Sequence, residues 1–369
     1  MKIDTINLAD VVRSAHEKAL AERGSVNVLV VGKTGTGKST LVNTVFNDRI
    51  AATGQGRPIT QFMRRYTRAG SAVSIYDTKG LEVADYRGIF EDLKTKVREI
   101  NRSERAEDHI HVAWLCIAEG ARRVENAEIE LAKILDELSV PVVIAITTAV
   151  SDQGFHAEVR KIFHSVSNVV RVNSVPFEMD EGVVVPMKGV DVLVDATMEI
   201  VPEAQKNAFA AAQCIKIEHK VIRSRDAVRR AAGLAMACGA APIPAADALA
   251  IVPIQVAMIA SISAIFGLNV TTGFLTTLVT SSIGATSATL GGRALVGRLL
   301  KLIPGAGPLV GGAMSAAVAG TVTTVFGEAY IAVLKKLVTD NPDRPLTAEE
   351  IASALKAQID GGRSRTMRA

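Results

Sequence analysis

Apolar and polar positions follow two different periods in the first 205 residues. Short runs rich in valine and isoleucine, typical of buried strands, are separated by longer stretches with apolar residues at helical spacing. This alternation predicts an α/β domain, a mainly parallel sheet with helices on both faces. The expected strands are residues 26–31, 62–68, 72–76, 111–117, 140–146 and 169–172. The expected helices between them are residues 39–46, 87–102, 125–138, 157–166 and 191–200.

The pattern changes after residue 205. Residues 203–232 predict a basic amphipathic helix, and the runs 248–292 and 302–327 that follow contain no charged residue. These uncharged runs predict an all-α hydrophobic domain. The expected parts are an N-terminal amphipathic helix (1–24), the α/β domain (25–205), the hydrophobic helical domain (206–338) and a C-terminal helix with a tail (339–369).

The two uncharged runs also resemble each other. Pro244 is followed 23 residues later by Gly267, and Pro304 is followed at the same offset by Gly327. In both places Ile precedes the proline and Phe precedes the glycine. The match indicates an internal repeat with a period of 60 residues, with chance similarity in an Ala- and Gly-rich segment as the alternative.

Composition and charge narrow the classes of function. Lys and Arg number 42 against 38 Asp and Glu, a mild net charge of +4, and no aromatic residues interleave with the basic stretch. We therefore expect no nucleic-acid partner. The cysteines Cys116, Cys214 and Cys238 have no metal-binding spacing and are expected to be reduced thiols in the cytoplasm. Acidic residues among the first twenty positions argue against a signal peptide.

The strongest motif follows the first expected strand and opens the helix over residues 39–46. It has the form GxxxxGK followed by Ser, in which glycines let backbone N–H groups surround a phosphate and the helix N-terminus adds its positive dipole end. Lys38 is expected to reach the β- and γ-phosphates, and Ser39 to bind Mg²⁺. The residues expected to bind the nucleotide phosphates are Gly32, Lys33, Thr34, Gly35, Thr36, Gly37, Lys38, Ser39 and Thr40.

A second element, Asp77-Thr78-Lys79-Gly80, ends the strand expected over residues 72–76. Asp77 is expected to hold Mg²⁺ through water, and the Gly80 amide to contact the γ-phosphate. The polar loop over residues 51–60 has the features of a switch, ordered by a threonine that binds Mg²⁺ in the triphosphate state. We favour Thr60 over Thr53 for this role, because Thr60 directly precedes the strand expected beside the Asp77 strand. Residues 79–85 are the expected second switch.

The segments GKTGTGKSTLVN, GRPIT and DTKG resemble the first three nucleotide-binding elements of translation-factor-related GTPases, in the group of bacterial Era-like and septin-like proteins. In that group a hydrophobic domain of unknown function follows the GTPase domain, and the run PIPAADALAIVPIQVAMI is similar to it. The resemblance implies binding of GTP and GDP with Mg²⁺, and hydrolysis of GTP to GDP and phosphate. It implies catalytic roles for Lys38, Thr60 and Gly80.

The base-reading element departs from the family pattern Asn/Thr-Lys-x-Asp. Here the strand over residues 140–146 runs into Thr147-Thr148-Ala149-Val150-Ser151-Asp152, which has no lysine and has its aspartate two places late. Three interpretations are open. Asp152 reaches guanine from a longer loop, Thr148 takes over the packing role of the lysine, or Asp152 only caps the next helix. Ser174 lies where the family makes a backbone contact to the base. Weak guanine selectivity leaves an ATPase as an alternative.

A second departure concerns hydrolysis. Leu81 follows Gly80, where Ras-like enzymes carry the glutamine that orients the attacking water. We therefore expect slow turnover, or water positioned by another group after nucleotide-dependent homodimerisation or partner docking. The candidates for that group are Gln61, Lys79 and Arg123. A scaffold with structural nucleotide and negligible hydrolysis is the alternative.

The uncharged runs raise the question of a membrane. Residues 248–266 approach the length needed to span the hydrocarbon core, and the small residues in the later runs suit close helix packing in a bilayer. They equally suit a buried bundle in a soluble protein. The favoured expectation is membrane insertion or tight attachment at the cytoplasmic face of the inner membrane, with the basic stretches on the cytoplasmic side.

Overall fold

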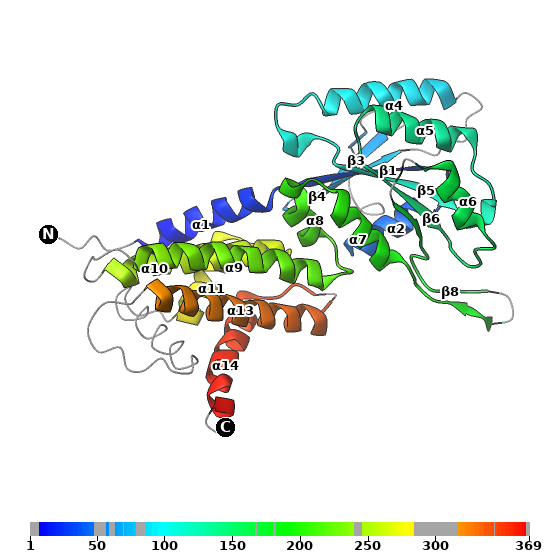
Figure 1. The fold of residues 1–369 in the computed structure, drawn as a ribbon. Coiled ribbons are helices and arrows are strands. Elements are labelled where there is room, and N and C mark those ends of the chain that lie inside the picture. Colours follow the sequence, from blue (N-terminus) through cyan, green and yellow to red (C-terminus); the bar gives the residue numbers. More distant parts are fainter. Residues whose placement is uncertain are drawn as a thin grey trace. The chain divides into compact units, whose positions relative to one another are not determined.

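The computed structural model (Figure 1) describes residues 7–47, 57–58, 63–68, 70–78, 86–164, 166, 168–179, 182–239, 246–283, 316–342 and 344–366. The chain divides into two compact units. The sheet unit is Gly24–Lys216, and the helical unit combines Met1–Arg23 with Ile217–Ala369. Each unit is described by itself.

The sheet unit is built on a seven-stranded sheet. Its strands are β1 (Val26–Gly32), β2 (Arg57–Pro58), β3 (Met63–Thr67), β4 (Val73–Thr78), β5 (Val112–Ala118), β6 (Val142–Thr147) and β7 (Asn168–Arg171). Their order is β2-β3-β4-β1-β5-β6-β7, with β4, β1, β5, β6 and β7 parallel and the pairs β2/β3 and β3/β4 antiparallel. Every residue of β1 is buried, as befits a central strand covered on both faces.

Helices cover both faces of this sheet (Figure 1). One face packs against α2 (Lys38–Phe46), α7 (Val190–Ile200) and α8 (Lys206–Ala212), and the other against α4 (Tyr86–Ile100), α5 (Asn126–Glu137) and α6 (Phe155–Ile162). In the first core the Trp114 ring stacks on Phe46, with 5.7 Å between ring centroids, and Trp114 Nε1 donates a hydrogen bond to Thr197 Oγ1. The predicted fold class is confirmed, and the elements differ from the expected ranges mainly at their ends.

A small hairpin is added to this plan after β7. Its strands are β8 (Phe177–Glu178) and β9 (Val184–Val185), which pair antiparallel and extend away from the sheet in Figure 1. Two-residue strands carry no measurable alternation, so the sequence pattern does not predict them. Beyond the hairpin, Asn173 and Lys188 exchange both backbone hydrogen bonds, at 2.9 and 3.0 Å, and so hold its base.

The basic helix expected over residues 203–232 is interrupted. The chain instead forms η4 (Glu203–Gln205), α8 and then α9 (Ile217–Gly239). The fully buried Gln213 side chain accepts hydrogen bonds from the Ile215 and Lys216 amides, at 2.9 and 2.7 Å, and donates to the Lys216 carbonyl. These bonds satisfy the backbone of the turn between the two helices. The boundary between the units therefore lies after Lys216, whereas the sequence pattern suggests residue 205.

The helical unit consists of α1 (Leu8–Arg23), α9, α10 (Ala246–Ile265), α11 (Thr272–Ile283), α13 (Ala316–Asp340) and α14 (Ala348–Thr366). The N-terminal helix α1 packs along α10 rather than forming a separate part. Ser261 Oγ donates to Glu22 at 3.1 Å, and His16 Nε2 is 3.0 Å from the Val270 carbonyl oxygen. In the core, Tyr330 and Ser263 are fully buried and joined by a 2.7 Å hydrogen bond between their hydroxyls.

The two members of the proposed repeat differ in local structure. Gly267 has a φ of +81° and follows the end of α10, where a left-handed residue favours glycine. Gly327 lies inside α13, and a Cβ there would meet Val228 Cγ2 at 2.5 Å. The matched glycines therefore have different structural roles. Gly267 follows the end of α10, whereas Gly327 lets α13 pack closely against α9. Pro244 and Pro304 lie outside the described residues.

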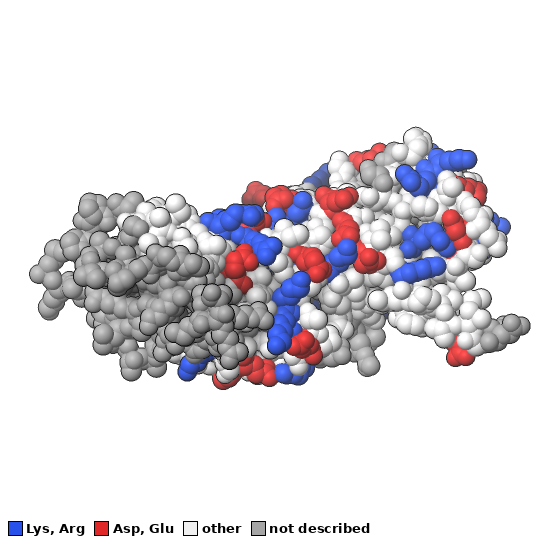
Figure 2. All heavy atoms as spheres, turned by 60° about the horizontal axis from the view of Figure 1, so that its bottom comes forward, with Lys and Arg blue, Asp and Glu red and all other residues white. Residues whose placement is uncertain are grey.

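Within the described residues, one helix, α13, is long and apolar enough to cross a membrane by length and composition. More than half of its most apolar window is buried inside the helical unit, and the core helix of a soluble protein passes the same test. Two ion pairs join α9 to α13, Arg225 with Glu328 and Glu218 with Lys335. In the view of Figure 2, basic and acidic side chains are interspersed over the described part of the surface.

Candidate nucleotide-binding site

The phosphate loop joins β1 to α2 at the carboxyl edge of the sheet. Gly32 has a φ of +144° and lies opposite Cys116 in the register of β1 and β5. A Cβ on Gly32 would stand 2.4 Å from the Cys116 carbonyl oxygen, so only glycine fits. Gly35 and Gly37 have φ values of +77°, with open space beside them. The loop therefore has the strand, turn and helix context that the motif requires.

Lys38 begins α2 and is buried, with 9% of its surface exposed. Its Nζ donates hydrogen bonds to the carbonyl oxygens of Gly32, at 2.9 Å, and Lys33, at 2.7 Å. Thr36 Oγ1 donates to the same Lys33 oxygen at 2.8 Å. The ammonium is thus held by the loop itself. The other motif side chains, Thr34, Ser39 and Thr40, are exposed.

Asp77 lies near the end of β4, opposite Val30 in the neighbouring β1. Its Oδ1 is buried and has no hydrogen-bond partner among the described residues. Burial raises the pKa of the Asp77 carboxyl, and the nearby charge of Lys38 acts against that rise. An orphaned buried carboxylate oxygen beside a phosphate loop suits a hard cation with oxygen ligands, so Asp77 and the Ser39 hydroxyl fit Mg²⁺.

Several expected site residues lie outside the described residues. They are Thr60 and Gly80, together with Gln61, Lys79 and Leu81. Of the two expected switches, only Arg57–Pro58 is described, as β2 paired with β3. The proposed metal ligand and γ-phosphate contacts from these segments therefore stay predictions.

Arg123 is the described candidate for a water-positioning or charge-stabilising group. Its side chain is 77% exposed, and its Nη2 lies 3.6 Å from Glu125 Oε1. The same carboxylate forms an ion pair with Lys33 of the phosphate loop, which lowers the pKa of Glu125. Glu125 also caps α5 in a capping box with Glu128. Arg123 is thus connected to the phosphate loop through one shared carboxylate.

The loop that follows β6 takes the place of the family's base-reading element. Thr148 has a φ of +50°, and its hydroxyl donates to the Thr147 carbonyl oxygen at 2.7 Å. Asp152 Oδ1 accepts the His156 amide at 2.8 Å and so caps the start of α6. The helix-capping contact of Asp152 is thus present, while a contact from Asp152 to guanine and replacement of the lysine by Thr148 stay predictions.

Glu119, which follows β5, was not among the site residues expected from the sequence. It is only 2% exposed, and its Oε2 accepts the amides of Val150 and Ser151 at 2.6 and 2.8 Å. Its Oε1 accepts Arg171 Nε at 2.6 Å. A charged residue at the carboxyl end of a buried strand was the available signal, but the sequence alone does not show that it reaches the loop after the next strand.

The loop after β7 completes this edge of the sheet. Ser174 is nearly buried, and its carbonyl oxygen accepts a hydrogen bond from Thr44 Oγ1 of α2 at 3.2 Å. The Asn173 side chain donates to the Pro186 carbonyl oxygen at 2.8 Å. The phosphate loop, Asp77, the loop after β6 and Ser174 therefore all lie at the carboxyl ends of parallel strands, where ligands bind in open α/β sheets.

Two family models match the chain. Residues 27–148 match "50S ribosome-binding GTPase", and residues 209–359 match "Domain of unknown function (DUF697)". No curated protein matches. The chain therefore combines a GTP-binding P-loop GTPase domain with a C-terminal domain that matches this second family. The resemblance noted from the sequence is confirmed for both parts.

Solved structures similar to the chain include a probable GTP-binding protein engB, at 14% identity and a TM-score of 0.33, covering 47% of this chain and 98% of that one. Era from Aquifex aeolicus bound to GDP.AlF4- is similar at 16% identity and a TM-score of 0.34, covering 57% and 68%. Era in complex with MgGDPNP and part of 16S ribosomal RNA is similar at 16% identity and a TM-score of 0.33. The match covers 49% of this chain and 58% of that one. Likeness at this level concerns the fold alone.

Proposed function

We propose that the chain binds GTP together with Mg²⁺ and hydrolyses it slowly to GDP and phosphate. The observation that carries this proposal is the buried Asp77 Oδ1 without a hydrogen-bond partner among the described residues, near the Lys38 ammonium. When bound, Mg²⁺ neutralises charge on the phosphates and orients them. Ser39 and Asp77 would hold it, with Thr60 as the ligand expected from the sequence.

The rest of the chemistry falls to groups of the chain itself. The amides of the phosphate loop and the N-terminus of α2 offer donors to the phosphates. Lys38 would exchange the Gly32 and Lys33 carbonyls for phosphate oxygens, a short movement of a flexible side chain. Positioning and charge stabilisation supply most of the catalysis in phosphoryl transfer. Since Leu81 cannot orient the attacking water as a glutamine does, turnover is expected to be slow.

A hydrolysis assay on the full chain tests the proposal. Wild type is expected to release phosphate from GTP at a rate below about 1 s⁻¹, and only when Mg²⁺ is present. Asp77→Asn removes the negative charge expected to hold Mg²⁺ and should abolish the Mg²⁺-dependent release of phosphate, while Asp136→Asn, at an exposed position on α5, should behave as wild type. Equal rates in wild type and Asp77→Asn would refute the assignment of Asp77. Competition between ATP and GTP tests the ATPase alternative.

A nucleotide-dependent homodimer is proposed as the source of the missing water-positioning group. Arg123 supports it, because this exposed arginine is connected to Lys33 of the phosphate loop through the shared carboxylate of Glu125. The mass of the full chain in solution should double with a non-hydrolysable GTP analogue and not with GDP. A monomer in both states would mean that the group comes from this chain or from another protein.

We also propose that the helical unit attaches the GTPase domain to the cytoplasmic face of the inner membrane, so that the nucleotide state acts as a switch there. The length and apolar composition of α13 and the uncharged run over residues 248–292 support this proposal. The competing candidate is a soluble bundle, favoured by the burial of α13 against α9. Extraction of cell membranes with alkaline carbonate separates the two. Retention in the membrane supports attachment, and full release supports the soluble bundle.

A further inference from the structure

The side chains of Glu119, Arg122 and Lys188 bind the backbone of the loop over residues 148–152. Glu119 binds the Val150 and Ser151 amides, while the carbonyl oxygens of the loop are bound from outside. Arg122 Nη1 donates to the Asp152 carbonyl oxygen at 3.0 Å, and Lys188 Nζ donates to the Val150 carbonyl oxygen at 3.4 Å. A loop held on both its donors and its acceptors has a defined shape before any ligand arrives.

Glu119 is the centre of this arrangement. Its carboxylate is almost fully buried, yet it is matched by two amides and by the Arg171 guanidinium, whose Nη2 is 2.5 Å from Oε1. A buried charge is tolerated only with such partners, and losing one partner leaves an uncompensated charge. Arg171 continues the chain of contacts, because its Nε lies 3.7 Å from Asp152 Oδ1.

The order of the strands places Glu119 between the phosphate-binding and the base-binding ends of the expected nucleotide site. The phosphate loop and Asp77 follow β1 and β4, whereas the loop over residues 148–152 and Ser174 follow β6 and β7. β5, which is followed directly by Glu119, lies between these two pairs of strands. Glu119 turns toward the β6 and β7 side, away from the strands that carry the phosphate-binding residues.

We propose that Glu119, through its pair with Arg171, is a positioning residue for the base end of the nucleotide site. It binds the Val150 and Ser151 amides and so holds residues 148–152 in the shape that receives the base. This loop lacks the lysine of the family pattern, and its Asp152 carboxylate caps α6. The proposal rests on the proposed function. It requires Glu119 to set nucleotide affinity without entering the chemistry at the γ-phosphate.

The test compares Glu119→Gln with Glu137→Gln in the full chain. Both variants neutralise one carboxylate, but Glu137 is exposed on α5 and its ion pair within the described part of the chain is with Lys94 of α4. Glu119→Gln should raise the Kd for GDP and the KM for GTP by about tenfold or more, as expected for loss of charge-assisted hydrogen bonds. Its kcat at saturating GTP should stay within about twofold of wild type. Glu137→Gln should change neither value.

A Kd for Glu119→Gln within about twofold of wild type would overturn the proposal, as would a kcat that falls in step with affinity. If Glu119→Gln does not fold, Arg171→Lys replaces it. That variant keeps the positive charge but cannot contact Glu119 through two nitrogens, as Arg171 does with Nε and Nη2. Its Kd for GDP should rise by about threefold with kcat unchanged. An unchanged Kd overturns the proposal. Failure of the proposed function looks different, because wild type itself would then bind no GDP.

Discussion

Replacing Gly32 by alanine tests the close packing behind the phosphate loop. The new Cβ would stand 2.4 Å from the Cys116 carbonyl oxygen, and φ is +144° at this residue. Gly32 and Cys116 belong to neighbouring central strands, so neither backbone can move without disturbing the sheet. Backbone strain costs about 1–2 kcal/mol and overpacking about 1–3 kcal/mol, so we expect Gly32→Ala to lose about 3 kcal/mol of unfolding free energy.

Gly35→Ala in the same loop is the matched control. Gly35 has a φ of +77° but nothing within 4 Å of the added Cβ. Only the strain of the left-handed conformation applies, about 1 kcal/mol. The pair therefore separates the close contact at Gly32 from the general requirement for glycine in a turn.

Urea unfolding followed by tryptophan fluorescence measures this difference. Trp114 is the only tryptophan in the chain and is fully buried in the sheet unit, so its signal reports on that unit. With a urea dependence of about 2 kcal/mol per M, the midpoint should fall by about 1.5 M in Gly32→Ala and by about 0.5 M in Gly35→Ala. Equal shifts in the two variants would refute the reasoning from the Cys116 contact.

Two further outcomes are expected. Burial lowers the pKa of His111, whose Nδ1 accepts the Asn27 amide at 2.9 Å, so the folded state disfavours the protonated ring. The contribution of the neutral His111 ring to the free energy of unfolding should be fully present above about pH 6.5 and be lost as the pH drops through the lowered pKa. Urea midpoints at pH 5 and 7 should therefore differ less in His111→Asn than in wild type. In the helical unit, Gly327→Ala should lower thermal stability by about 1–2 kcal/mol through contact with Val228. Gly233→Ala in open space on α9 should raise it by about 0.5–1 kcal/mol, and circular dichroism compares the two.

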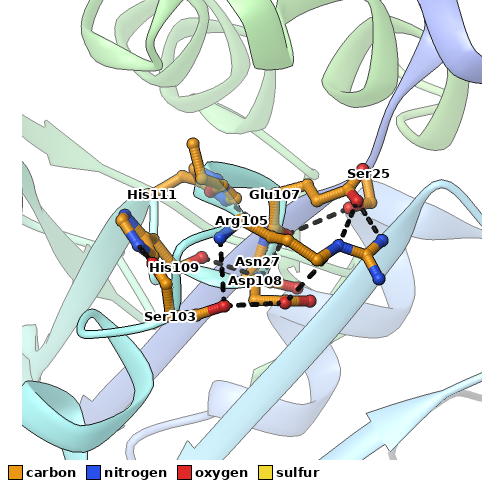
Figure 3. A network of polar contacts seen from close by, with 9 residues as sticks. Ser25, Asn27, Ser103, Arg105, Glu107, Asp108, His109 and His111 are labelled. Atoms are coloured by element: carbon orange, nitrogen blue, oxygen red, sulfur yellow. Dashed lines mark hydrogen bonds and ion pairs between the residues drawn. The ribbon is translucent and has the colours of Figure 1, made fainter.

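The polar network under the sheet shows why the pattern alone locates a strand but not its surroundings. The apolar run ahead of Gly32 identifies β1, yet Asn27 within it is 1% exposed. Its side-chain amide donates to the Glu107 and His109 carbonyl oxygens, at 3.0 and 2.7 Å, in the network drawn in Figure 3. Such bonds join residues about eighty positions apart, so no local pattern reveals them.

The positions of the expected phosphate-binding residues were predictable because the pattern that contains them is local. A strand, a glycine loop and a helix follow each other in sequence, and Lys38 and Ser39 occupy fixed offsets in that run. Asp77 also followed from its place at the end of a strand, and it lies on β4 directly beside β1. Parallel neighbours bring both elements to one edge of the sheet without further information.

The base end of the site was less predictable because it depends on tertiary contacts. Glu119 and Arg171 are 52 positions apart, and their pairing arises only when β5, β6 and β7 lie side by side. The break after α8 has a similar origin, since the buried Gln213 side chain replaces helical hydrogen bonds with its own. Helical periodicity continues through that point and so gives no sign of it.

Titration of the full chain with a non-hydrolysable GTP analogue in the presence of Mg²⁺ measures directly whether this site binds a nucleoside triphosphate. The site described around Lys38 and Asp77 predicts one equivalent of analogue bound, weaker binding when Mg²⁺ is removed, and loss of binding in Lys38→Ala. Wild type that binds no analogue, or Lys38→Ala that binds as tightly as wild type, would contradict the account.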